Sequence, residues 1–165
     1  MKRICLISDT HGHIASDMIP YLTECDEIWH AGDIGTIETA DELAKIRPLR
    51  AVYGNIDNHI VRSVYPEDNI FTCEGMSVWM THIGGYPGNY EPRIKKKLQT
   101  DVPGLFISGH SHILKVIYDK KIGLLHLNPG AAGFYGFHKI RTMLRFTLDE
   151  GAIRELSIVE MPKKQ

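Results

Sequence analysis

Five short and largely apolar runs, each followed directly by a small polar cluster, are the feature of this sequence that most constrains its fold. Short apolar runs are typical of strands that are covered on both faces of a sheet. The runs span residues 4–7, 27–31, 49–53, 76–81 and 105–108. The clusters are Asp9-Thr10-His11, Gly32-Asp33, Gly54-Asn55, Thr81-His82 and Gly109-His110-Ser111-His112. We therefore expect a fold built on buried strands whose ends carry polar side chains.

Helical segments alternate with the first three runs. Residues 17–23 are expected to form a short helix that Pro20 limits. A second helix is expected to be capped by Thr36 and to extend to about Ile46, because its apolar residues recur with helical spacing. Since this gives the order β-α-β-α-β, the first three strands are expected to be parallel.

The rest of the chain is richer in strands. Hairpins are predicted over residues 70–81, 114–127 and 142–159, with a helix from about residue 91 to 99. The chain has 165 residues, 43% of them hydrophobic, which is the size and composition of one folded domain. We predict a single α/β domain over residues 1–165, with two mixed sheets packed together and helices outside.

The charge balance argues against nucleic acid as a stable partner. There are 19 basic and 20 acidic residues, giving a net charge of −1. Such a chain has no large basic field to attract long nucleic acid, although a small phosphate ester remains acceptable as a substrate. Association with a second copy through sheet edges or exposed loops is left open.

The cysteines and the apolar runs predict a cytoplasmic location. Cys5, Cys25 and Cys73 are odd in number and include no Cys-x-x-Cys pair, so they are expected to be reduced and mostly buried. The apolar stretch at residues 4–7 is too short for a signal peptide. No run approaches the roughly 20 residues that span a bilayer, so no membrane partner is expected.

The polar clusters supply a set of side chains suited to binding metals. In open α/β sheets ligands bind beyond the carboxyl ends of the strands, so these side chains are expected to share one polar cup. Carboxylate, imidazole and amide ligands suit Mn(II), Fe(II), Co(II), Ni(II) or Zn(II), with Mn(II) favoured, better than Ca(II) or Mg(II). The expected ligands are Asp9, His11, Asp33, Asn55, His82, His110 and His112.

This set is large enough for two ions, which predicts metal-assisted hydrolysis. Asp9 and His11 are two residues apart and would point to the same side of an extended segment. His110 and His112 have the same spacing and would serve one ion, or two ions if the turn is irregular. In a dinuclear phosphoesterase site a water that bridges the ions becomes a hydroxide nucleophile, and the ions offset the charge of the transition state.

The five clusters, in this order, resemble the calcineurin-like metallophosphoesterase superfamily, whose pattern is Asp-x-His, Gly-Asp, Gly-Asn, His and Gly-His-x-His. The Gly-Asn-Ile-Asp segment at residues 54–57 and the Asn-Pro-Gly segment at 128–130 are similar to its small bacterial and archaeal phosphodiesterases. The resemblance implies a four-layer α-β-β-α sandwich. It also implies two ligand sets that share Asp33: Asp9, His11, Asp33 and His112 in one, and Asp33, Asn55, His82 and His110 in the other.

The resemblance implies a phosphodiesterase in which Asp33, Asn55 and His82 have catalytic roles. Many members carry a histidine after the asparagine, where it stabilises the transition state or protonates the leaving group, but this chain has Ile56. His82 is followed by Ile83 rather than by Gly-His. The source of the leaving-group proton is therefore open, and activated aryl esters should be better substrates than alkyl esters.

Two other functions are weighed against hydrolysis of small phosphodiesters. A retromer subunit shares the implied fold and uses it as a non-catalytic interaction module, but it has lost several metal-site histidines, whereas this chain has the full set. A nuclease of the same superfamily is the second alternative, and the near-neutral charge argues against it.

Several other residues are given provisional roles. His30 and His126 are expected to be satisfied core or supporting histidines, and His59 a loop residue. Arg93 is a candidate phosphate contact, and residues 133–137 could form a stacking wall for a base or aryl group, with ordinary packing as the alternative for both.

Overall fold

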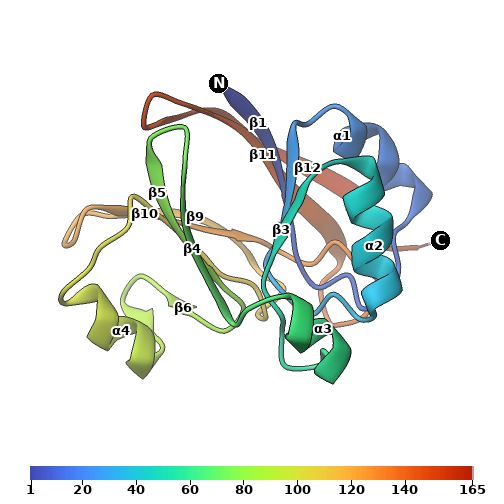
Figure 1. Ribbon diagram of the computed structural model, residues 1–165, viewed down its shortest axis with the longest axis horizontal. Helices are drawn as coiled ribbons and strands as arrows, with labels where there is room; N and C mark the ends of the chain where they lie inside the picture. The colour runs from blue at the N-terminus through green and yellow to red at the C-terminus, as the bar shows by residue number, and fades with distance from the viewer. Residues whose placement is uncertain (165) are drawn as a thin grey trace.

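The computed structural model describes residues 1–164 and contains two five-stranded sheets that pack face to face (Figure 1). In the first sheet three parallel strands lie beside an antiparallel hairpin, in the order β12-β11-β1-β2-β3. The hairpin pairs with β1, so the first and last strands lie in the same sheet. The strands are β1 (Lys2–Ile7), β2 (Glu27–His30), β3 (Leu49–Ala51), β11 (Ile140–Asp149) and β12 (Ala152–Pro162).

The second sheet has the order β4-β5-β8-β10-β9. Its three central strands are parallel, and each edge strand is antiparallel to its neighbour. The strands are β4 (Asp68–Cys73), β5 (Met76–Thr81), β8 (Leu105–Ile107), β9 (Leu114–Asp119) and β10 (Leu124–Pro129). A small separate hairpin is formed by β6 (Gly85–Tyr86) and β7 (Asn89–Tyr90).

Helices cover the outer faces of both sheets. Leu43 of α2 packs with Cys5 and Ile7 on the outside of the first sheet, and Ile94 of α4 packs with Phe106 on the outside of the second. The helices are η1 (Ser16–Met18), α1 (Ile19–Thr23), α2 (Ile37–Ile46), α3 (His59–Val64) and α4 (Pro92–Leu98). This α-β-β-α arrangement confirms the predicted fold class. No helix within residues 1–164 is long and apolar enough to cross a membrane.

The main core lies between the two sheets and follows from the alternation of side chains along each strand. Ile4 and Leu6 of β1 point into it, whereas Cys5 and Ile7 point toward the helices. The ring of Trp29 fills the centre, making edge contacts with Phe71 of the second sheet at 5.0 Å and with Phe146 at 5.7 Å between ring centroids.

The helix α3 was not expected from the sequence, which assigned His59 to a loop. Its residues include three β-branched side chains, which have low helix propensity. Tertiary contacts support it instead: the Asn58 side chain accepts a hydrogen bond from the Val61 amide, and Val61 packs against Ile34. This short helix lies directly after the third polar cluster.

Two buried histidines are expected to make the fold sensitive to acid. Burial lowers the pKa of both His30 and His126 to about 4, below the ordinary 6.5. Between these values the unfolded chain binds more protons than the folded chain. The stability that the two neutral histidines contribute is therefore fully present above pH 6.5 and is lost as the pH falls toward 4. Each histidine contributes a slope of up to about 1.4 kcal/mol per pH unit.

Urea unfolding of the metal-free protein at several pH values tests this expectation. In His126→Gln, whose amide can still donate to the Phe106 carbonyl, the slope between pH 6.5 and 4 should fall markedly. An unchanged slope in this variant would contradict the assignment.

Candidate metal centre

The structure brings all seven predicted ligands to one place, at the carboxyl ends of β1, β2, β3, β5 and β8. Each side chain follows the strand that the sequence predicts for it, and the loops that carry them converge where the sheets meet. Asp9, Asp33 and His82 are buried, while the other side chains line the opening. The predicted cup is therefore present as a geometric feature.

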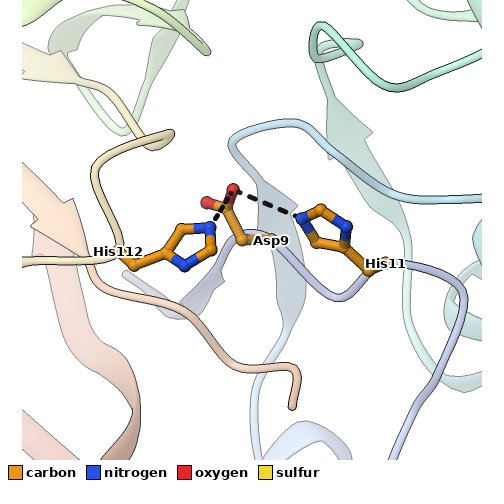
Figure 2. A group of neighbouring side chains, drawn as sticks. All are labelled: Asp9, His11 and His112. Carbon is orange, nitrogen blue, oxygen red and sulfur yellow. Dashed lines mark hydrogen bonds and ion pairs between the residues drawn. The ribbon is translucent and has the colours of Figure 1, made fainter. Parts of the chain in front are cut away.

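Asp9, His11 and His112 form a first group, shown in Figure 2. One ligand atom from each lies within 4.8 Å of the others. The Nε2 atom of His112 is 3.1 Å from Asp9 Oδ1, and the Nε2 atom of His11 is 3.9 Å from the same oxygen. All three side chains thus direct a donor atom toward one point.

Asp33, His82 and His110 form a second group with the same spacing. The Nε2 atom of His82 is 3.3 Å from Asp33 Oδ2, and His110 Nδ1 is 3.1 Å from the Asn55 side-chain oxygen. Asp33 Oδ2 is also 3.5 Å from His11 Nε2, so this carboxylate lies between the two groups. The three members of each group belong to one of the two ligand sets that the resemblance implies, and their role as metal ligands stays a prediction.

The backbone at these ligands is unusual. Non-glycine residues rarely adopt positive φ, and clusters of such residues mark functional sites. The expectation that Asp9 and His11 lie on an extended segment is wrong, and the Gly109–His112 turn is irregular, which places its two histidines in different groups. Positive φ occurs at Asp9 (56°), His11 (49°), Asp33 (57°), His110 (69°) and His112 (62°).

The protonation state of His82 indicates that the centre fits a cation. Its Nδ1 lies 2.8 Å from the Ala31 carbonyl, which can only accept, so Nδ1 carries a proton and Nε2 faces the carboxylates. The Nε2 atoms of His82 and His11 are buried and have no hydrogen-bond partner within residues 1–164. Buried imidazole nitrogens that face carboxylate oxygens form a ligand set suited to a divalent transition-metal ion.

The pKa shifts reflect the same electrostatics. Burial lowers the pKa of His82, but Asp33 and Asp9 outweigh it and raise the pKa overall. Burial raises the pKa of Asp33, but the contacts with His82 and with the Ile56 amide together outweigh it and lower the pKa overall. The site therefore stabilises positive charge beside its carboxylates.

Hydrogen bonds orient each carboxylate so that one oxygen is held by neighbouring donors and the other faces the histidines. Asp9 Oδ2 accepts from the Ser8 hydroxyl at 2.6 Å and from the His110 amide at 3.2 Å, which leaves Oδ1 facing the histidines. Asp33 Oδ1 accepts from the Ile56 amide at 3.1 Å, which leaves Oδ2 facing them. Such outer hydrogen bonds are typical supports of metal ligands.

Two glycines of the clusters are required by close packing. A Cβ atom at Gly54 would lie 2.1 Å from Asp33 Oδ1, and one at Gly32 would lie 2.6 Å from His82 Nδ1. Both contacts are far closer than carbon atoms tolerate. The glycines therefore allow the second group to assemble.

Two supporting residues were not recognised from the sequence. Asp57 accepts hydrogen bonds from the Gly54 amide at 2.7 Å and the Ile34 amide at 3.1 Å, which ties together the loops after β3 and β2. Arg62, on α3, donates to the carbonyls of Asp57 at 2.7 Å and Asn55 at 3.2 Å. Asp57 belongs to the Gly-Asn-Ile-Asp segment, but its supporting role is not evident from that segment. Arg62 reaches the loop only because α3 is folded.

The other provisional assignments have mixed outcomes. His30 is a satisfied core histidine, bonded to Thr10 at 2.9 Å and to the Gly32 amide at 3.1 Å. Arg93 lines a pocket of about 330 Å³ beside Asn55 and His82, but its guanidinium is engaged by Asp68 at 2.9 Å. Its role as a phosphate contact stays a prediction.

Sequence comparisons now identify the class of protein. The family model described as the calcineurin-like phosphoesterase superfamily domain matches residues 1–151. A probable metallophosphoesterase of Methanothermobacter thermautotrophicus is 29% identical over 138 residues, which cover 78% of this chain and 76% of that protein. Because the match spans nearly the whole sequence, this chain belongs to the calcineurin-like phosphoesterase superfamily.

Solved structures with the same architecture include a Vps29 protein and an archaeal phosphodiesterase. Wild-type Vps29 of Entamoeba histolytica, complexed with Zn²⁺, superposes with a TM-score of 0.74 at 16% identity, covering 98% of this chain and 99% of that one. An archaeal phosphodiesterase superposes with a TM-score of 0.64 at 16% identity, covering 95% and 99%. At such identities the likeness concerns the fold alone.

Proposed function

We propose that this protein is a metal-dependent phosphodiesterase with a dinuclear centre, for which Mn(II) is the preferred ion. The observation that carries the proposal is the pair of ligand groups joined by Asp33, with the buried, unpartnered Nε2 atoms of His11 and His82 directed at carboxylates. Membership of the phosphoesterase superfamily supports the reaction class. The archaeal phosphodiesterase of the same fold supports the preference for diesters.

The roles of the side chains follow from their contacts. Divalent ions, when bound, supply Lewis acidity toward the phosphate and lower the pKa of water. Asp33 would hold both ions, because its Oδ2 faces both groups. His82 would offer the lone pair of Nε2, because its Nδ1 proton is donated to the Ala31 carbonyl. Asn55 would add a neutral oxygen to the second group. These residues would hold the ions in place before substrate binds.

The missing histidine after Asn55 defines the expected leaving group. Ile56 is 45% exposed at the rim and has no proton to give. General acid catalysis contributes about 10²–10⁴-fold to reactions with poor leaving groups. Esters of acidic phenols, which leave as stable anions, should therefore be hydrolysed at least about 10²-fold faster than alkyl esters.

Hydrolysis of bis(4-nitrophenyl) phosphate after chelation and reloading with single metals tests the proposal. We expect chelated protein to be inactive, Mn(II) to restore activity, and 4-nitrophenyl phosphate to be the poorer substrate. Protein that is inert with Mn(II), Fe(II), Co(II), Ni(II) and Zn(II) would contradict the assignment. A preference for the monoester would contradict only the diester specificity.

The proposed setting is the cytoplasm, and the proposed substrate is a small phosphodiester rather than nucleic acid. Cys5, Cys25 and Cys73 are all buried and unpaired, which suits a reducing compartment. The near-neutral net charge of −1 supports a small substrate.

A non-catalytic interaction module on the same fold, as in the retromer subunit, is the second candidate. Vps29, which is not named as a phosphoesterase, shares the fold at a TM-score of 0.74. The complete ligand set favours the enzyme. Retention of one or more metal ions without hydrolysis of any phosphate ester would favour the module.

A further inference from the structure

A pocket of about 380 Å³ opens beside the metal centre. It shares His110 and His112 with the two ligand groups, so a group that enters it lies next to the centre. Its volume is at the lower end of the range for pockets that bind small molecules. The remaining lining residues are Ser111, Ile113, Tyr135, Gly136, Phe137 and His138.

The walls of this pocket expose large apolar side chains to solvent. Phe137 is fully exposed, Tyr135 is 71% exposed and Ile113 is 56% exposed. Aromatic side chains bury 150–250 Å² each when they are covered, so leaving two of them in water forgoes a large favourable term. Clustered exposed apolar groups mark binding sites more often than isolated ones. Here the cluster adjoins a metal centre.

The segment that carries the two aromatic residues is held in place by its own contacts. The ring of Tyr135 lies over that of His11, with centroids 4.9 Å apart. His138 Nε2 donates to the Gly133 carbonyl at 2.8 Å, and the Lys163 ammonium donates to the Gly136 carbonyl. The ring of Tyr135 and the backbone of the segment are therefore held in place before a ligand binds, which reduces the entropy lost on binding.

Gly136 allows the segment that carries the aromatic residues to pack closely against His112. Its φ is 129°, and a Cβ atom there would lie 2.2 Å from the Nδ1 atom of His112. A larger residue would displace either His112 or the segment. The glycine thus lets the segment that carries Tyr135 and Phe137 pass directly against a proposed ligand.

We propose that this pocket binds a planar aromatic group, a nucleobase or an aryl ring, attached to the phosphate that is held at the centre. The inference rests on the proposed function and names its substrate class: phosphodiesters with an aromatic substituent. Aromatic faces on Tyr135, Phe137 and the neighbouring histidines favour a stacked planar ring over an alkyl chain of equal area. The small volume, beside the proposed ligands His110 and His112, favours a substituent of the substrate over a protein segment.

Binding of phosphonates, which are not hydrolysed, tests the pocket independently of catalysis. Mn(II)-loaded protein is titrated by calorimetry with phenylphosphonate, cyclohexylphosphonate and methylphosphonate. We expect phenylphosphonate to bind about tenfold more tightly than methylphosphonate and severalfold more tightly than cyclohexylphosphonate. Equal affinities for the phenyl and methyl compounds would overturn the inference.

Variants assign the preference to the wall. Tyr135→Ala combined with Phe137→Ala should reduce the ratio of phenyl to methyl affinity to near one. The matched control Tyr118→Ala, a 58% exposed tyrosine on β9 that does not line the pocket, should leave the ratio unchanged. Circular dichroism checks that the exposed substitutions leave the fold intact. A double variant that keeps the full preference would overturn the assignment.

The outcomes separate this inference from the proposed function. Hydrolysis of bis(4-nitrophenyl) phosphate without a phenyl preference would overturn the pocket and leave the phosphodiesterase standing. A phenyl preference without hydrolysis would support the pocket and contradict the catalytic activity. The wall could instead contact a second copy of the chain. The inference would be overturned if the wild type shows no phenyl preference but self-associates on size-exclusion chromatography, and the double variant does not self-associate.

Discussion

Asp33→Asn is expected to reduce metal-dependent hydrolysis of bis(4-nitrophenyl) phosphate by at least about 10²–10³-fold. The carboxylate is buried, and its Oδ2 is 3.3 Å from His82 Nε2 and 3.5 Å from His11 Nε2, so it contacts both groups. It lies closer to these two atoms than Asp9 Oδ1, which is 3.9 Å from each. An amide of the same shape removes the negative charge that would join two cations. The variant should also bind fewer metal ions per chain, measured by metal analysis after gel filtration.

The matched control is Asp101→Asn, an exposed aspartate in the loop after α4 that lines none of the pockets beside the centre. It changes the net charge by the same amount, so general electrostatic effects are subtracted. Wild-type activity is expected for this control. Full activity in Asp33→Asn would remove the basis for a bridging carboxylate and for the proposed mechanism.

Trp29→Ala is expected to lower the free energy of unfolding by about 3–5 kcal/mol. The Trp29 side chain has no exposed surface; it contacts Phe71 across the space between the sheets and Phe146 within its own sheet. The alanine leaves a cavity that neighbouring residues cannot fill, because they belong to two different sheets. For a chain of this size the midpoint of thermal unfolding should fall by roughly 6–20 °C.

Urea unfolding followed by circular dichroism measures this loss. Trp29→Phe keeps an aromatic ring in the same space and should retain a large part of the stability. Tyr118→Ala, at an exposed site, should change the free energy of unfolding by less than about 0.5 kcal/mol. A loss below about 1 kcal/mol in Trp29→Ala would show that the two sheets do not depend on this contact.

The loops beyond the strand ends show which features of the site could be predicted from the local sequence and which could not. Asp9, Asp33 and Asn55 follow strands whose apolar runs are readable in sequence, and parallel strands bring their carboxyl ends to one edge. Their convergence could therefore be predicted without coordinates. The helix α3 could not, because its own residues favour it weakly and packing of Val61 stabilises it. Arg62, which braces the Asn55 loop, was missed with it.

The candidate metal centre shows which features the sequence alone determined and which the tertiary structure decided. Local patterns determined the strands, the polar clusters at their ends and the kinds of ligand atom. The spacing of His110 and His112 left open whether they serve one ion or two. Their left-handed backbone and the contact of His112 with Asp9, 103 residues away, place them in different groups. That division depends on the packing of two sheets, which no local pattern contains, because contacts between distant residues form only when the whole core is assembled.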